Sequence, residues 1–250
     1  MDKNTLYHIT AAHLGYITMS LPALATTFAV AYSVLYDFHG STATHCRVRN
    51  ILPSISAAIA RSPQQYIWRI FISLHAAPRF MYALAYYGWH KQVHVGARQT
   101  TYIFLAKVAV FLHIMENMML VLLTCISSND NRDIHENSFI AFIITSWMYM
   151  LLTIGLCKWA RKYTDKTHKT DCGSYRYKKL FAFGNISSFT LAIYLYFRHN
   201  WFCEPYIYSL FALCEYVTIF TNILFHGTAV LDMREYSAGI VLTDLLNKHR

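Results

Sequence analysis

The sequence has few charged residues, and this shortage excludes most classes of soluble protein. Only 14% of the 250 residues are charged, whereas 55% are hydrophobic. A chain of this composition is too apolar for an ordinary soluble domain. The sequence also lacks Gly/Ser-rich linkers, low-complexity tracts and internal repeats, so nothing in it separates a second domain. We therefore expect residues 1–250 to form a single transmembrane domain.

Motifs that would indicate a familiar chemistry are missing too. There is no CxxC or HExxH spacing, which argues against a zinc site, and we expect no metal and no cofactor. There is no GxSxG sequence, so the nucleophile elbow of many serine esterases is not indicated. Ser54 and Ser56 are conceivable nucleophiles, but the sequence around them does not distinguish them.

The chain does have six long apolar stretches. A transmembrane helix needs about 20 predominantly apolar residues. The first stretch is too long for a cleavable signal peptide, and no small-residue cleavage site follows it, so we interpret it as a retained helix. We predict an all-α, polytopic membrane protein with a six-helix transmembrane bundle. The expected spans are 14–36, 66–89, 100–125, 138–160, 178–197 and 205–230.

Lysine and arginine residues predict the orientation of these spans. With the N-terminus in the cytosol, the cytosolic segments hold 14 basic residues and the opposite loops hold 5. This asymmetry is usual for membrane proteins, so both termini are expected in the cytosol and no nucleic acid is expected as a partner. The basic loop 158–179 would then be a solvated cytosolic loop or a contact for anionic lipid. The long loop 37–65 would be lumenal, and its apolar middle favours a short helix.

Two cysteines fall in the loops predicted to be lumenal. Because a lumenal compartment is oxidising, Cys46 and Cys203 are the pair that we expect to form a disulfide. The alternatives are two free thiols or a bond that involves Cys125.

Three predicted spans carry polar residues that a bilayer tolerates only beside a partner or water. Helical spacing gives each of these spans a polar stripe, and we expect the three stripes to face one another. Arg79 would be neutralised by Glu116 or Glu215. The stripes would either fix helix packing or line a cleft for a lipid head group, with His75 or His113 as a general base. The polar residues of these spans are Arg69, His75, Arg79, Lys107, His113, Glu116, Asn117, Glu215, Asn222 and His226.

The lumenal ends of the spans add a second set of polar residues, because three separate loops each contain a histidine. These loops are either simply exposed, or they help to activate a lipid hydroxyl, with Asn137 and Asn200 as donors to a developing oxyanion. The candidate catalytic residues are His45, His75, His135, Glu136 and His199. The candidate substrate-binding residues are Arg69, Arg79, Glu116, Asn117, Asn137, Arg198, Asn200, Glu215, Asn222 and His226.

Several segments carry a resemblance to a known family. They are Thr42–Cys46, Leu52–Ser56, Pro63–Arg69, Leu74–Phe80, Glu116–Asn117, Ile134–Asn137, Tyr196–Asn200, Glu215–Tyr216, Thr221–Asn222 and Phe225–His226. Taken in order, they resemble the post-GPI-attachment-to-proteins factor two family, whose members remodel the lipid of glycosylphosphatidylinositol (GPI) anchors. The resemblance implies a multi-pass protein of the Golgi membrane, or of the endoplasmic reticulum membrane.

The same resemblance implies a role and partners. The chain would restore a saturated acyl chain at the sn-2 position of lyso-GPI, which GPI-anchored proteins need for stable surface expression. The acyl donor would be acyl-CoA or a phospholipid. The resemblance supplies no catalytic residue, so whether the chain is itself an acyltransferase stays open. The alternatives are a non-catalytic lipid-binding partner of a remodelling enzyme and, less favoured, a membrane transporter.

Overall fold

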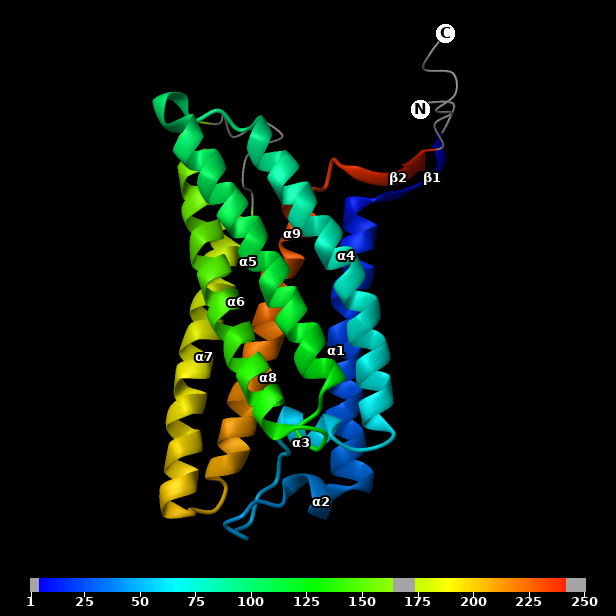
Figure 1. Ribbon diagram of the computed structural model, residues 1–250. Helices are drawn as coiled ribbons and strands as arrows, with labels where there is room; N and C mark the ends of the chain where they lie inside the picture. The colour runs from blue at the N-terminus through cyan, green and yellow to red at the C-terminus, as the bar shows by residue number, and fades with distance from the viewer. Residues whose placement is uncertain (1–4, 164–173, 242–250) are drawn as a thin grey trace.

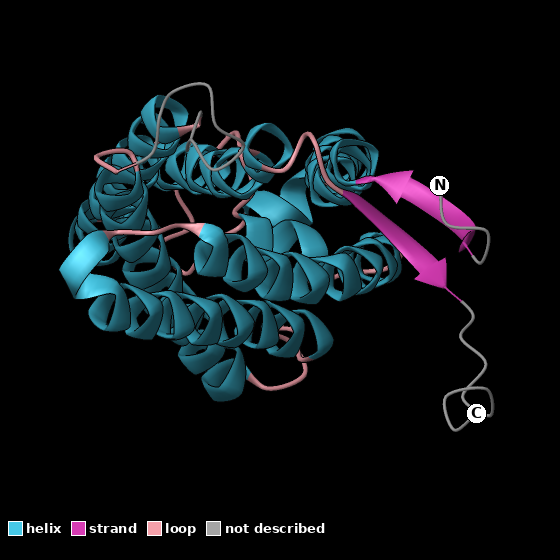
Figure 2. Cartoon of the chain, turned by 90° about the horizontal axis from the view of Figure 1, so that it is seen from above, coloured by secondary structure: helices cyan, strands magenta, loops and turns pink. Residues whose placement is uncertain are grey.

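The fold is a bundle of long helices with a small β-hairpin at one end (Figures 1 and 2). The computed structural model of the chain describes residues 5–163 and 174–241. Its long helices are α1 (Ala11–Tyr36), α4 (Gln64–Gln92), α5 (Gln99–Cys125), α6 (Arg132–Ala160), α7 (Tyr175–Phe202) and α8 (Ile207–Gly227). Its short elements are α2 (Phe38–Thr42), α3 (Ile55–Ile59), the 3-10 turn η1 (Gly96–Arg98), α9 (Ala229–Asp232), β1 (Thr5–Thr10) and β2 (Ser237–Val241).

The chain is an all-α multi-pass membrane protein apart from the hairpin. Within the described ranges, five helical segments are long and apolar enough to cross a membrane: α1, η1–α5, α6, α7 and α8–α9. α4 is 29 residues long but is not one of the five, because Arg69, His75 and Arg79 are among the residues that reduce its hydropathy. α4 nevertheless packs against α1 and α5 within the bundle (Figure 1).

The β-hairpin was not predicted. β1 and β2 pair antiparallel, with Thr10 opposite Ser237, and the backbone N–H of Ala11 donates to the carbonyl of Tyr236. Each strand lies outside the apolar stretches and has only five or six residues, so a search for spans does not detect it. We call this the hairpin end of the bundle, and the opposite end, where Cys46 is bonded to Cys203, the disulfide end.

Two helices, α6 and α7, extend several residues past the predicted spans at the disulfide end. α6 begins at Arg132 instead of residue 138, because the side chain of Asn131 accepts a hydrogen bond from the N–H of Ile134 and caps the helix. α7 continues to Phe202 and ends where Cys203 adopts the left-handed backbone conformation. Residues 135–137 and 198–200 therefore lie on helix ends and not in the loops predicted for them.

The long loop 37–65 contains the expected short helix, α3, and folds back into the bundle there. Ser54 caps α3, since its Oγ accepts a hydrogen bond from the N–H of Ala57 at 3.2 Å. Ala58 is fully buried, and its cluster also contains Ala25, Ala29, Ile55, Ile59, Trp68 and Ile72. This burial fixes α3 against α1 and α4 at the disulfide end (Figure 1).

The main apolar core occupies the half of the bundle toward the hairpin end. It joins α4, α5, α6, α7 and α8 through buried residues that include Trp89, Tyr102, Met150, Leu156 and Phe225. The cavity described next lies in the other half, beneath α3.

Candidate functional site

Arg79 on α4 lies in a buried polar network that joins four helices. Its Nη2 is 3.2 Å from Oε2 of Glu116 on α5 and 2.8 Å from Nε2 of His226 on α8. Oε1 of Glu116 lies 2.9 Å from Nε2 of His226 and accepts a hydrogen bond from Nδ2 of Asn222 at 3.0 Å. Asn222 also donates to Oγ of Ser146 on α6 at 2.8 Å. Arg79 is 1% exposed and Glu116 0%, so these charges are compensated inside the protein.

The network shows which carboxylate neutralises Arg79. Glu116 does so, whereas Oε2 of Glu215 accepts a hydrogen bond at 3.1 Å from the N–H of Ile55, at the start of α3. Glu215 therefore holds α3 in place and does not pair with Arg79.

The other polar residues of the predicted stripes also contact neighbouring helices. Nδ1 of His75 is 2.7 Å from the carbonyl oxygen of Thr18 on α1, and Nδ2 of Asn117 donates to the carbonyl of Ala76 at 2.9 Å. The ring of His113 packs against that of His226, with 4.8 Å between centroids. Lys107, in contrast, is exposed on α5 and takes no part in the network.

A cavity of about 80 Å³ lies between this network and α3. Its wall is mostly apolar, and three partly buried phenylalanines of α6 and α7 form part of it: Phe139, Phe142 and Phe189. A concave apolar site with a few converging polar groups is the usual form of a small-ligand site. The polar side chains that line it are Ser56, His75, Arg79, His135, Asn185, Glu215, Thr218 and Asn222.

Two of these polar groups form a hydrogen-bonded pair, the hydroxyl of Ser56 on α3 and the imidazole of His135 on α6. Oγ of Ser56 lies 3.2 Å from Nε2 of His135. Nδ1 of the same ring is 2.8 Å from the carbonyl oxygen of Ile126 and 3.1 Å from that of Leu123. Because a carbonyl oxygen only accepts, Nδ1 carries the ring proton, and Nε2 presents its lone pair to the serine hydroxyl. His135 can therefore take a proton from Ser56.

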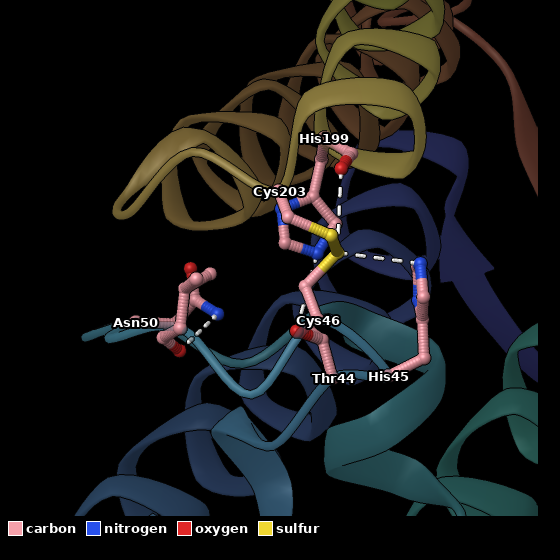
Figure 3. The surroundings of a disulfide bond; sticks show 7 residues. Thr44, His45, Cys46, Asn50, His199 and Cys203 are labelled. Atoms are coloured by element: carbon pink, nitrogen blue, oxygen red, sulfur yellow. Dashed lines mark hydrogen bonds between the residues drawn. A yellow bond between two sulfur atoms is a disulfide. The ribbon is translucent and has the colours of Figure 1, made fainter.

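The two remaining histidines predicted at the lumenal ends lie elsewhere, beside the disulfide (Figure 3). Nε2 of His199 is 3.1 Å from Oγ1 of Thr44, and the exposed ring of His45 is 5.7 Å from that of His199 between centroids. His45, Cys46 and Cys203 are close enough for a metal site, but both sulfurs are used by the disulfide and are not thiolate ligands. The three histidines therefore do not converge on one site, and only His135 reaches the cavity.

Comparison with known proteins identifies the family. Residues 10–236 match the family described as Frag1/DRAM/Sfk1/Cwh43P N-terminal domain. The chain is 38% identical to a Xenopus tropicalis protein named acyltransferase PGAP2 over 231 residues, which are 92% of this chain and 90% of that protein. It is 40% identical to the Caenorhabditis elegans post-GPI attachment to proteins factor 2 over 237 residues, covering 89% of this chain and 84% of that protein. The chain belongs to the post-GPI attachment to proteins factor 2 family. No solved structure gives a significant match.

In this member of the family, Arg69 lies outside the cavity that it was predicted to line. Its Nη2 is 2.7 Å from Oδ2 of Asp130 and donates to the carbonyl of Cys125 at 2.9 Å. Hydrogen bonds from Ser127, and the nearby Arg69 guanidinium, lower the pKa of Asp130. Arg69 thus joins α4 to the turn between α5 and α6.

Four further candidates lie near the bundle surface at the disulfide end. Glu136 pairs with Arg132 at 2.7 Å, and Asn137 is exposed. Successive helical residues are rotated by about 100°, so these two point away from the cavity that His135 faces. Arg198 pairs with Glu204 at 2.6 Å, and its hydrogen bonds lower the pKa of that carboxyl, while Asn200 is half-buried beside it on α7.

A second buried ion pair was missed by the sequence analysis. Nζ of Lys178 on α7 is 2.6 Å from Oδ2 of Asp232 on α9, and both side chains are 1% exposed. Lys178 also donates to Oγ of Ser174 at 2.7 Å, and Tyr86 donates to Asp232 at 3.0 Å. Lys178 therefore belongs to the interior and not to the solvated basic loop 158–179, of which residues 164–173 lie outside the described part of the chain.

The disulfide is expected to contribute substantially to stability. It joins residues 157 positions apart, and closing a loop of that length is worth about 5 kcal/mol in a free unfolded chain. Helices that stay in a membrane restrict the unfolded chain already, so we expect Cys46→Ser to destabilise the protein by about 2–4 kcal/mol. The measurement is thermal unfolding of the purified protein in detergent, with Cys125→Ser, which alters an exposed free thiol, as the control. Equal midpoints for the two variants would contradict the expectation.

Proposed function

We propose that this protein remodels the lipid of GPI anchors by placing a saturated acyl chain on the sn-2 hydroxyl of lyso-GPI. Its partners would be GPI-anchored proteins and a lipid acyl donor, and its product would support their stable surface expression. The family supports this proposal, since relatives are named for post-GPI attachment and two are named acyltransferases. The observation that carries it is the mostly apolar cavity in which a histidine faces a serine hydroxyl.

We also propose six spans with both termini in the cytosol, and a location in the Golgi or endoplasmic reticulum membrane. The sixth span would be α4, whose polar residues contact neighbouring helices. The disulfide end would then face the lumen, where an oxidising compartment allows the Cys46–Cys203 bond. The cavity, which lies beneath α3, would be in the lumenal half of the bundle.

This placement favours a phospholipid as the acyl donor. A CoA thioester would approach from the cytosol, at the hairpin end, and would have to pass the main apolar core. A phospholipid of the lumenal leaflet would meet the bundle at the level of the cavity. The reacting ester would lie in the cavity. The rest of the acyl chain would extend past Phe139, Phe142 and Phe189.

The proposal predicts a change in anchor lipids that mass spectrometry can measure. In cells that lack the protein, GPI anchors should lose the saturated sn-2 chain, and the wild-type protein should restore it. His135→Ala should reduce restoration by at least about 100-fold, the usual contribution of a general base. Asp133→Ala, which alters an exposed side chain in the same turn of α6, should restore it fully. Unchanged anchor lipids in the deficient cells would contradict the proposed function.

One observation favours a second function. Glu116 already neutralises Arg79, so the network would serve equally well in a non-catalytic protein that binds lyso-GPI for another enzyme. The purified protein in vesicles that contain phospholipid and lyso-GPI distinguishes the two. An acyltransferase forms remodelled GPI there without another protein, whereas a binding partner does not.

A further inference from the structure

Ser56 faces a histidine ring nitrogen, whereas two other serines near the cavity form different hydrogen bonds. Its neighbour Ser54 caps α3 and is 4% exposed, so its hydroxyl has a structural task. Ser138, one turn beyond His135 on α6, donates to the carbonyl of Ile134 at 2.7 Å. Ser56 is half-buried and lines the cavity. Its Oγ is 3.2 Å from Nε2 of His135, whose lone pair can accept the hydroxyl proton. A serine nucleophile and its base have this arrangement.

The His135 ring is held in the orientation in which Nε2 can accept the proton of Ser56. Two backbone carbonyls at the end of α5 accept from Nδ1 and occupy the place of the acidic residue in a catalytic triad. The ring is 4% exposed, so it does not rotate into solvent. The base and its orienting groups therefore come from α5 and α6, and the nucleophile comes from α3.

We propose that Ser56 carries the acyl group during transfer, with His135 as the general base, in two successive displacements. The inference rests on the proposed function and adds the covalent intermediate to it. The pairing of Ser56 with His135 supports a stepwise route, because a hydroxyl that faces a base is the arrangement of a covalent nucleophile. The apolar wall also limits the access of water, which would hydrolyse an acyl-serine ester.

The first displacement consumes the donor. Oγ of Ser56 attacks the ester carbonyl carbon of a phospholipid and gives its proton to Nε2 of His135. The bond between that carbon and the glycerol oxygen breaks, and Nε2 returns the proton to the leaving oxygen. The products are a lysophospholipid and an ester on Ser56.

The second displacement reverses these roles. The sn-2 hydroxyl of lyso-GPI gives its proton to Nε2 of His135 and attacks the carbonyl carbon of the acyl-serine. The bond to Oγ of Ser56 breaks, and Oγ regains a proton from Nε2. No oxidant, reductant or water is consumed.

The test looks for the intermediate on the full-length protein. The purified protein is incubated with a phospholipid that carries a saturated chain ending in an alkyne, then denatured, and the labelled peptide is identified by mass spectrometry. We expect an acyl adduct on Ser56 that hydroxylamine removes and that lyso-GPI depletes. Ser56→Ala should lose the adduct, His135→Ala should form it at least about 100-fold more slowly, and Ser138→Ala should resemble wild type. Ser56→Cys should form a thioester at the same position, which a purely structural role of Ser56 would not produce.

Two outcomes would contradict the acyl-serine intermediate but would not contradict the proposed function. One is normal GPI remodelling in cells that contain only Ser56→Ala. The other is transfer to lyso-GPI by the purified wild-type protein with no adduct on Ser56, which would indicate direct attack by the lipid hydroxyl. Failure of the proposed function itself would appear separately, as unchanged anchor lipids in cells that lack the protein.

Discussion

Glu116→Gln is expected to destabilise the protein by about 3–5 kcal/mol, the cost of leaving one charge of a buried pair without its partner. Glutamine keeps the size of the side chain and can still bond Asn222, but it leaves the guanidinium of Arg79 uncompensated at 1% exposure. The measurement is the thermal unfolding midpoint in detergent, together with the amount of protein in cells.

Two comparisons make this expectation specific to burial. Glu136→Gln removes the carboxylate that pairs with Arg132. The Arg132 side chain is 71% exposed and that of Glu136 53%, and exposed ion pairs contribute only about 0–1 kcal/mol to stability. The double variant Arg79→Met with Glu116→Leu removes both charges and should recover much of the lost stability. If the Glu116→Gln and Glu136→Gln variants had the same unfolding midpoint, Arg79 and Glu116 would not form a buried ion pair.

The second large effect is expected at Lys178. Lys178→Met leaves the carboxylate of Asp232 buried without a cation, and we expect a loss of about 3–5 kcal/mol. Lys179→Met is the matched control, because Lys179 is the next residue along α7 and its side chain is exposed. Both variants remove one positive charge near the hairpin end, so a shared effect on topology cancels in the comparison. Unfolding midpoints that agree would show that Lys178 is solvated, one of the two environments predicted for the basic loop 158–179.

Long apolar helices could be predicted because their signal is local. A stretch such as 100–125 is recognisable from composition alone, and α5 spans Gln99–Cys125. The polar stripes could be predicted for the same reason, since helical spacing places His226 on the same face as Asn222. Lys178 was misplaced because counting basic residues beside a span treats each of them as solvated. Its carboxylate partner, Asp232, lies 54 positions away on α9.

The Ser56–His135 pair depends on contacts between distant segments. The two residues are 79 positions apart, and they meet only because α3 folds back into the bundle. Its return depends on burial of Ala58 and on the hydrogen bond from Ile55 to Glu215, neither of which has a local pattern. The phase of α6 then decides that His135, and not Glu136 or Asn137, faces inward. From sequence alone all three residues are site candidates, because residues 135–137 are placed in a loop, where helical spacing does not apply.

The hairpin and the disulfide together set the order in which the protein can be completed during synthesis. β1 leaves the ribosome before any long helix, but its partner β2 emerges only after all of them. Cys46 likewise waits for Cys203, which follows α7. The pairing of β1 with β2 and the bond of Cys46 to Cys203 therefore form only after the helices between the two partners have been made. A premature stop codon just before Ser237 would remove only the final strand from the described fold, yet it would leave β1 at the opposite terminus unpaired for quality-control factors to recognise.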